Sequence, residues 1–245
     1  MKTKEKQQNN KVDILAFGAH PDDVEAGCSG LLIKLANEGY KTAIIDMSEA
    51  ELSTNGTVAL RYKEAENARK IMGVSYRENL KVPNNFFANS VKLQNKLVEK
   101  LRFYRPEMVL LPYFKDRHPD HEATPKLVKD ALFTAGLSRF KTKLPPHRPK
   151  YVFYYPLWYE FKPSFIVDIS GLWEKKKEAI LAYKSQFILT DKTKKTIDNS
   201  DDTMKYWEAR ARHYGFMANV SNGEAYLSHY PLGIDDPFKI MPNFF

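Results

Sequence analysis

The chain has 245 residues, 43% of them hydrophobic, which is enough to bury the core of one α/β domain. No apolar run approaches the roughly 20 residues that a membrane-spanning helix needs, and the single cysteine, Cys28, cannot form an internal disulfide, so we expect a cytoplasmic protein with no membrane partner. The formal charge of +8 comes from lysines that are scattered or in short runs, which are usually solvated; we therefore expect no nucleic-acid partner, and an anionic small substrate explains part of the charge bias.

The first two thirds of the chain alternate apolar runs with helix-like patterns. Residues 1–10 are polar and are expected to form a disordered tip, followed by a single domain over residues 11–245. Short aliphatic runs at 12–17, 42–47 and 108–111 predict buried strands, and the stretches between them carry apolar residues at helical spacing. This alternation is typical of an α/β fold with a Rossmann-like, mostly parallel sheet flanked by helices.

The last third continues with strands and helices but contains one irregular stretch. The runs at 151–155 and 164–169 predict two more strands, and a helix is expected from residue 172 to about residue 184. Residues 192–203 are polar and have little periodicity, so we expect a mobile loop there, followed by a helix over 204–214.

Side chains of the kind that bind metals follow the first and third predicted strands. His20, Asp22 and Asp23 come directly after the first strand, and residues 117–121 follow the third. Ligands of open α/β sheets bind beyond the carboxyl ends of the strands, so we expect both groups at one site. Imidazole nitrogen and carboxylate oxygen are zinc ligands, and they also suit ferrous iron and other first-row ions. The sequence therefore predicts a site for one divalent ion, with zinc as the first choice.

The residue types indicate how such a site would work. We expect His20, Asp23 and His121 to bind the metal ion, with one position left open for water. Asp22 is the neighbour that can stay off the metal and accept a proton from the water, although an isolated aspartate here could instead cap the helix that follows. His118 precedes His121 by three residues, so one helical turn can direct both side chains toward the same cavity.

Other kinds of site are not supported. Residues 18–21 lack the closely spaced glycines of a dinucleotide-binding turn, and no Gly-x-Ser-x-Gly elbow is present for a nucleophilic serine. Cys28 lies among small residues at a predicted helix start, where a lone thiol is expected to be a packed residue. Three further histidines have no partner motif and are expected to be packed or at the surface: His147, His213 and His229.

Two motifs together carry a family resemblance. The residues His20-Pro21-Asp22-Asp23 and His118-Pro119-Asp120-His121 resemble the motifs of the PIG-L (LmbE-like) zinc-dependent N-acetylglucosaminide deacetylases. Asn55-Gly56-Thr57 and the residues that follow look like the substrate loop of that family. Residues 208–215 and 223–226 are similar to the subgroup that deacetylates N-acetylglucosaminyl malate in bacillithiol synthesis. The resemblance covers nearly the whole chain after the first ten residues.

The resemblance implies an activity and assigns roles. It implies a metal-dependent hydrolase that removes acetyl from a small anionic glycoside, and a chain that forms a homo-oligomer. Asp22 would be the general base, and His118 would stabilise the tetrahedral oxyanion and protonate the departing amine. Asp120 would orient an imidazole, as carboxylates beside such histidines usually do. Arg61 and Arg117 match anion-binding positions, where guanidinium groups could pair with the two carboxylates of malate.

One position departs from the family pattern, and two alternatives stay open. Many members carry Thr-Arg-Gly where this chain has Thr54-Asn55-Gly56, so a contact made by that arginine is missing here. The enzyme could act on another small N-acetylated sugar. The chain could also be a catalytically silent sugar-binding module, although the presence of every motif residue argues against this.

Overall fold

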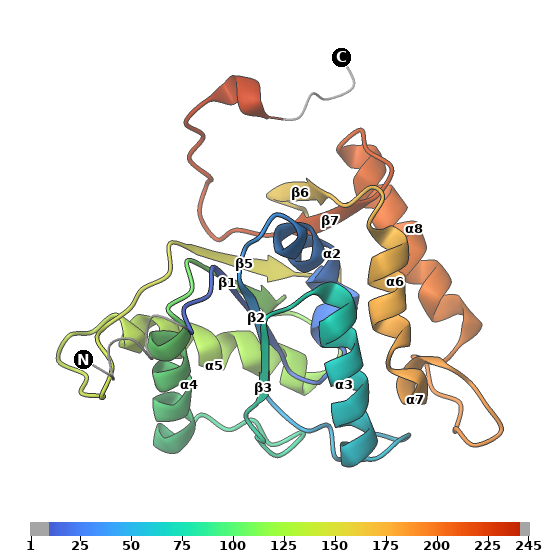
Figure 1. Ribbon diagram of the computed structural model, residues 1–245, viewed down its shortest axis with the longest axis horizontal. Helices are drawn as coiled ribbons and strands as arrows, with labels where there is room; N and C mark the ends of the chain where they lie inside the picture. The colour runs from blue at the N-terminus through green and yellow to red at the C-terminus, as the bar shows by residue number, and fades with distance from the viewer. Residues whose placement is uncertain (1–9, 241–245) are drawn as a thin grey trace.

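Five parallel strands form the central sheet of the computed structural model, which describes residues 10–240 (Figure 1). All but the last residue of the predicted disordered tip, 1–10, lie outside the described residues. The strand order is β3-β2-β1-β4-β5. The strands are β1 (Ile14–Gly18), β2 (Thr42–Asp46), β3 (Tyr76–Asn79), β4 (Met108–Pro112) and β5 (Tyr151–Tyr155). The predicted parallel α/β fold is confirmed; β3 was not predicted, because its sequence, YREN, is polar and half-buried at the sheet edge.

Helices cover both faces of this sheet. One face carries α2 (Asp23–Asn37) and α3 (Val58–Met72), with α6 (Trp173–Leu181) packed against both. The other face carries α4 (Val91–Tyr104) and α5 (Pro119–Ala135), which pack against each other (Figure 1). Successive residues of the strands therefore enter opposite cores, as in β1, where Ala16 packs on the α2 side and Leu15 and Phe17 pack on the α4 side.

The last third adds a second, two-stranded antiparallel sheet. It pairs β6 (Phe165–Asp168) with β7 (Gly223–Tyr226), and a bridge between Tyr154 and Leu227 connects it to β5. Strand β7 was not predicted; it is short and contains a charged residue. The helix predicted to reach residue 184 ends at Leu181 and is followed by the separate α7 (Lys184–Phe187).

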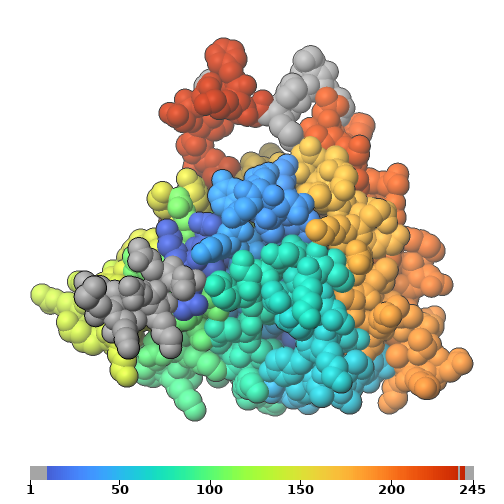
Figure 2. Space-filling model, viewed as in Figure 1, coloured from blue at the N-terminus to red at the C-terminus, as the bar shows by residue number. Residues whose placement is uncertain are grey.

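The last long helix and the C-terminal segment complete the described chain. The irregular segment after α7 ends at residue 200, because α8 (Asp201–Met217) begins three residues before the predicted start. Beyond β7 the chain leaves the body at the top of Figure 2 and ends with η1 (Pro237–Lys239). No helix within residues 10–240 has both the length and the apolarity needed to cross a membrane.

The strand order places one topological switch point in the sheet. Strand β1 is central; the chain adds β2 and β3 on one side of it, then β4 and β5 on the other. The connections that leave β1 and β4 therefore diverge to opposite faces and leave a crevice at the carboxyl ends of these two strands. The two groups of polar residues noted in the sequence follow these two strands.

Candidate metal and catalytic site

His20 lies on the turn between β1 and α2 and is buried. Its Nε2 is 3.1 Å from Oδ1 of Asn84 and 3.2 Å from Oδ2 of Asp120, which follows β4 a hundred positions later. These contacts orient the ring so that Nδ1 faces Oδ2 of Asp23 at 3.6 Å. Asp120 thus contacts the imidazole of His20, and its predicted role of orienting an imidazole stays a prediction. Sequence reasoning missed Asn84, because nothing in its local pattern marks it.

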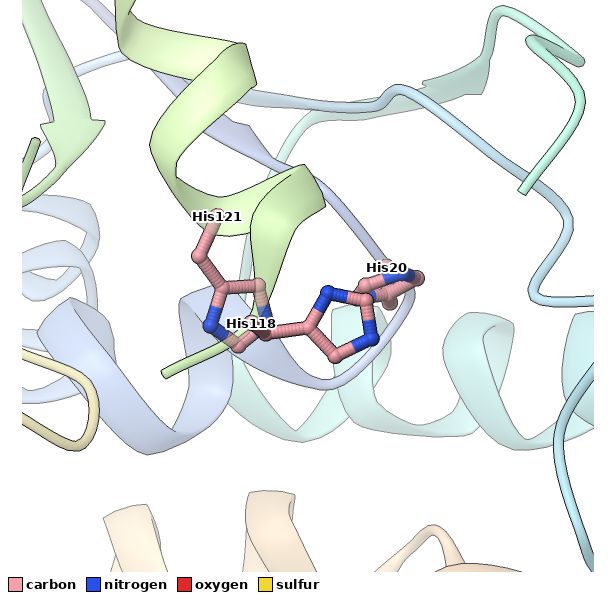
Figure 3. A group of neighbouring side chains, drawn as sticks. All are labelled: His20, His118 and His121. Atoms are coloured by element: carbon pink, nitrogen blue, oxygen red, sulfur yellow. The ribbon is translucent and has the colours of Figure 1, made fainter. Parts of the chain in front are cut away.

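The start of α5 brings His118 and His121 together (Figure 3). His118 is the N-cap, Pro119 opens the helix, and the rings of His118 and His121 stack with their centroids 4.8 Å apart. The ring of His20 lies 4.6 Å from that of His118. Burial and the positive charges of the two other histidines lower the pKa of His118 to about 4. Its Nδ1 accepts the backbone N–H of Asp120 at 3.2 Å, so the neutral ring carries its proton on Nε2.

His121 is held by two carboxylates. Its Nε2 is 3.2 Å from Oδ1 of Asp23, and its Nδ1 is 2.9 Å from Oδ1 of Asp116. Asp116 also accepts the backbone N–H groups of His118 and Trp158. Such a carboxylate fixes the tautomer and direction of a ligand histidine. Asp116 lies directly before the second motif in the sequence. Its contact with His121 depends on how the loop before α5 packs against that helix, so the sequence did not indicate it.

The spacing of these atoms suits a metal ion. Ligand atoms about 2.1 Å from a tetrahedral zinc ion are about 3.4 Å from one another. The oxygens of Asp23 lie 3.6 Å from Nδ1 of His20 and 3.2 Å from Nε2 of His121, close to this value. Nitrogen atoms of His20, His118 and His121 also lie within 4.8 Å of one another, as a group that could hold a metal. Asp23 also lies against His20 and His121, so the predicted ligand set of His20, Asp23 and His121 stays a prediction beside the group of three histidines.

The carboxylates also make this a site that favours positive charge. Burial lowers the pKa of His20, but hydrogen bonds to Asp120 and Asp23 outweigh burial and raise it to about 10. Burial likewise lowers the pKa of His121, and the charge of Asp23 with the hydrogen bond to Asp116 raises it to about 9. A divalent ion bound by the same nitrogens would displace these protons.

Asp22 lies beside this set and points to a different partner. It occupies the N-cap position of α2, yet its side chain makes no capping hydrogen bond. Its Oδ2 accepts a hydrogen bond from Nη1 of Arg61 at 2.7 Å. Burial raises the pKa of Asp22 to about 7, while the charge of Arg61 opposes the shift. Its backbone has φ of 136°, a conformation that costs a residue with a Cβ about 1–3 kcal/mol.

The two predicted substrate-binding arginines have different environments. Arg61 is buried, and besides Asp22 it donates to the carbonyl of Pro21 at 2.7 Å and to Oγ of Ser53 at 2.9 Å. Arg117 stacks its guanidinium on the ring of Trp158 at 4.1 Å. Both line the same cavity, so their contact with substrate stays a prediction; in the structure Arg61 holds Asp22, whereas Arg117 has no carboxylate partner within residues 10–240.

A single cavity of about 260 Å³ joins these groups. All the predicted site residues except Asp120 line it, and Asp120 lies behind His20. The sequence did not indicate the other polar groups that line it: Ser53, Thr54, Asn84, Gln186, Thr196 and Asp198. They lie on segments that are far apart in the chain, Gln186 on the short helix α7 and the others on loops.

The residues expected to be unrelated to the site lie elsewhere. His147 is half-buried and bonds the carbonyl of Pro106, while His213 and His229 are exposed. Cys28 is fully buried in the core, and burial raises the pKa of its thiol well above the ordinary value. These four residues are therefore packed or surface residues, as predicted.

Comparisons with known proteins agree with this geometry. The PIG-L family, described as GlcNAc-PI de-N-acetylase, matches residues 15–132. The conserved protein TT1542 from Thermus thermophilus is 34% identical and has a TM-score of 0.85, over 93% of this chain and 99% of its own. Diacetylchitobiose deacetylase of Thermococcus kodakarensis is 27% identical, over 89% of this chain and 82% of its own. N,N'-diacetylchitobiose deacetylase from Pyrococcus horikoshii, in a structure complexed with its inhibitor MPG, is 25% identical in sequence and has a TM-score of 0.79. The match covers 96% of this chain and 90% of that chain.

The family match covers the part of the chain that carries both polar motifs. Residues 15–132 include β1, β4 and both polar motifs, and the likeness to TT1542 extends over the rest of the fold. Because motifs, fold and relatives agree, the chain belongs to the PIG-L family, a family of deacetylases.

Proposed function

We propose that this chain is a zinc-dependent hydrolase of the cytoplasm that removes the N-acetyl group from N-acetylglucosaminyl malate in bacillithiol biosynthesis. The observation that carries the hydrolase assignment is the position of Asp22 and His118 beside the donor set of His20, Asp23 and His121 at one cavity. A base, an acid and a metal-binding set within reach of one another are what amide hydrolysis needs.

The residues of the chain would divide the reaction between them. A divalent ion held by His20, Asp23 and His121 would polarise the attacking water and the acetyl carbonyl. Asp22 takes the proton as the water oxygen bonds to the carbonyl carbon. His118 donates from Nε2 to the developing oxyanion. The C–N bond then breaks as His118 passes its Nε2 proton to the amine nitrogen and takes up in exchange the proton held by Asp22, and acetate and a free amino sugar leave.

The environment of Arg117 is the observation that favours an anionic aglycone. Its guanidinium faces the cavity without a carboxylate partner among residues 10–240, and such a group pairs well with the carboxylates of malate. The cavity is also small, near the lower end of ligand pockets, which span roughly 300–1,000 Å³. The two diacetylchitobiose deacetylases among the similar proteins favour another substrate, an N-acetylated chitobiose, and this is the alternative to test.

We also propose that the chain forms a homo-oligomer. Exposed apolar side chains gather on the C-terminal segment, where Tyr230 is 82% and Phe238 is 94% exposed. Apolar groups of this kind usually mark interaction surfaces. Light scattering should give a mass that is a multiple of the chain mass, and Phe238→Ser should reduce it; a monomer at all concentrations would contradict the proposal.

Acetate release tests the proposed substrate. Zinc-loaded protein should deacetylate N-acetylglucosaminyl malate with kcat/KM about ten- to a hundredfold above that for free N-acetylglucosamine, the scale of one charge-assisted contact. Arg117→Ala should remove this advantage, whereas the exposed Arg139→Ala should keep it. Arg61→Ala should lower turnover of both substrates, because it releases Asp22. A preference for diacetylchitobiose would replace malate with the alternative, and metal-loaded protein that deacetylates no sugar would indicate a binding module.

A further inference from the structure

One wall of the cavity comes from the irregular segment between α7 and α8, residues 188–200. Thr196 and Asp198 of this segment line the cavity together with Ser53 and Thr54 of the loop before α3. The segment is orange in Figure 2 and lies beside the start of α3 at the lower right of the molecule. These two loops are about 140 positions apart in the sequence, so a specific contact has to hold them together.

Asn55 makes that contact. Its side chain donates from Nδ2 to the carbonyl of Lys194 and accepts the N–H of the same residue, both at 2.8 Å. Asn199 donates to the same carbonyl at 2.9 Å, and Gln186 donates to the carbonyl of Asn55 at 2.9 Å. Asn55 is itself buried. The residue that departs from the Thr-Arg-Gly pattern of the family thus joins the two cavity loops.

Asp198 has no such partner. Within residues 10–240 its carboxylate makes no hydrogen bond or ion pair, although the residue is half-buried in the wall of the cavity. Burial raises the pKa of Asp198, and the positive charge of Arg117 opposes this shift. A carboxylate that is partly withdrawn from water gains from a hydrogen-bond donor that replaces the lost water. The cavity therefore presents an acceptor at Asp198 and a donor at Arg117, each left for a ligand to satisfy.

We propose that Asp198 is a substrate-binding residue that accepts hydrogen bonds from sugar hydroxyl groups, and that Asn55 is the positioning residue that holds it in the cavity. The inference rests on the proposed deacetylase function. A carboxylate accepts from neighbouring hydroxyl groups through its two oxygens, and these bonds are charge-assisted. It also repels anions, so the carboxylates of the aglycone would lie toward Arg117 and the sugar ring toward Asp198.

A deoxy-sugar series tests the contact of Asp198. The substrates are methyl N-acetylglucosaminide and its 3-deoxy, 4-deoxy and 6-deoxy analogues, compared in wild type, Asp198→Ala and the exposed control Asp191→Ala. Asp198→Ala should lower kcat/KM for the parent glycoside about ten- to a hundredfold, mainly through KM, with zinc content unchanged. For at least one deoxy analogue the same variant should have almost no effect, because the hydroxyl that it binds is already missing.

The outcomes separate the inference from the proposed function. Wild type that deacetylates neither these sugars nor N-acetylglucosaminyl malate contradicts the proposed function. Wild type that is active, with Asp198→Ala indistinguishable from Asp191→Ala or equally damaging for all four substrates, overturns the role of Asp198.

Asn55 needs a test that distinguishes positioning from general stability. Asn55→Ala should raise KM for the parent glycoside and speed amide exchange at Lys194, while kcat changes little. In the Asp198→Ala background it should change kcat/KM by less than about twofold, because residues that act through one another are not additive. A full independent loss in that background would show that Asn55 does not act through Asp198.

Discussion

At the scale of single residues, Asp22 has a strained backbone conformation. A φ of 136° accompanies a carboxylate that contacts Arg61 at the cavity rather than the amides of α2. A helix N-cap with ordinary backbone angles would accept those amides instead. The backbone strain is therefore consistent with a side chain held for chemistry, since strained conformations gather at functional sites.

The strain can be measured with two variants. Asp22→Gly and Asp22→Ala both remove the contact with Arg61, but only alanine keeps the Cβ that is strained at this φ. We expect the glycine variant to be more stable than the alanine variant by about 1–3 kcal/mol, the reverse of the usual order in helical regions. Urea unfolding of the metal-free proteins measures the difference. Equal stability, or a more stable alanine variant, would show that the turn relaxes without cost.

The proposed base can be separated from the ligands at the same position. Asp22→Asn keeps the size of the side chain and should keep the metal, while turnover falls about a hundredfold or more because no base remains. His121→Ala should instead lose most of the bound metal, as measured by elemental analysis. Loss of metal in Asp22→Asn would make Asp22 a ligand.

At the scale of elements, strand β7 stabilises helix α2, which is interrupted at Cys28. Helix α2 has a non-helical residue at Cys28, so the amides of Gly30 and Leu31 begin a new helical part and need acceptors. Glu224 of β7 accepts both, at 2.7 and 2.8 Å, and pairs with the ammonium of Lys176 on α6 at 2.6 Å. A Cβ at Gly30 would lie 2.7 Å from the carboxylate, which explains the glycine. The Gly-Glu-Ala-Tyr motif thus has a structural role in this fold.

Removal of Glu224 should therefore be costly. Glu224→Ala leaves the buried ammonium of Lys176 and two helix amides without partners, and we expect a loss of about 3–5 kcal/mol in the free energy of unfolding. The matched control is Glu208→Ala, which breaks the surface pair with Arg212 and should cost less than about 1 kcal/mol. Similar losses in urea unfolding for both variants would show that the buried network is not a stabilising element.

At the scale of the whole molecule, the site links parts of the chain that are far apart in sequence. The proposed ligands leave β1 and β4, which are neighbours only because the sheet reverses its direction of growth between them. A metal ion held at this point would cross-link the two halves of the sheet. Binding that occurs only in the folded state adds directly to its stability.

Metal removal should consequently lower the stability of the entire fold. Free zinc at a hundred times its dissociation constant should raise the free energy of unfolding by about 2.7 kcal/mol over that of chelator-treated protein. His121→Ala should show almost none of this gain. Thermal unfolding with and without chelator measures it, and a zinc effect of equal size in the variant would place the stabilising ion elsewhere.

The sequence by itself determined the parallel α/β fold and the two polar motifs. Buried strands are continuous aliphatic runs, and the motif residues directly follow two of them, so both signals are local. The same reasoning missed β3 and β7, whose four-residue strands contain charged side chains and are specified by pairing rather than by composition.

Only the tertiary structure decided how the motif residues are held. Asp120 was expected to orient an imidazole, but the imidazole that it contacts belongs to His20, a hundred positions away. The positions of Asn84 and Asp198 at the cavity likewise depend on how loops pack. Nothing in the sequence around Arg61 indicates that its guanidinium binds Asp22. Ligand-type residues can be read from short patterns because their chemistry is intrinsic, whereas their partners depend on which strands the fold makes neighbours.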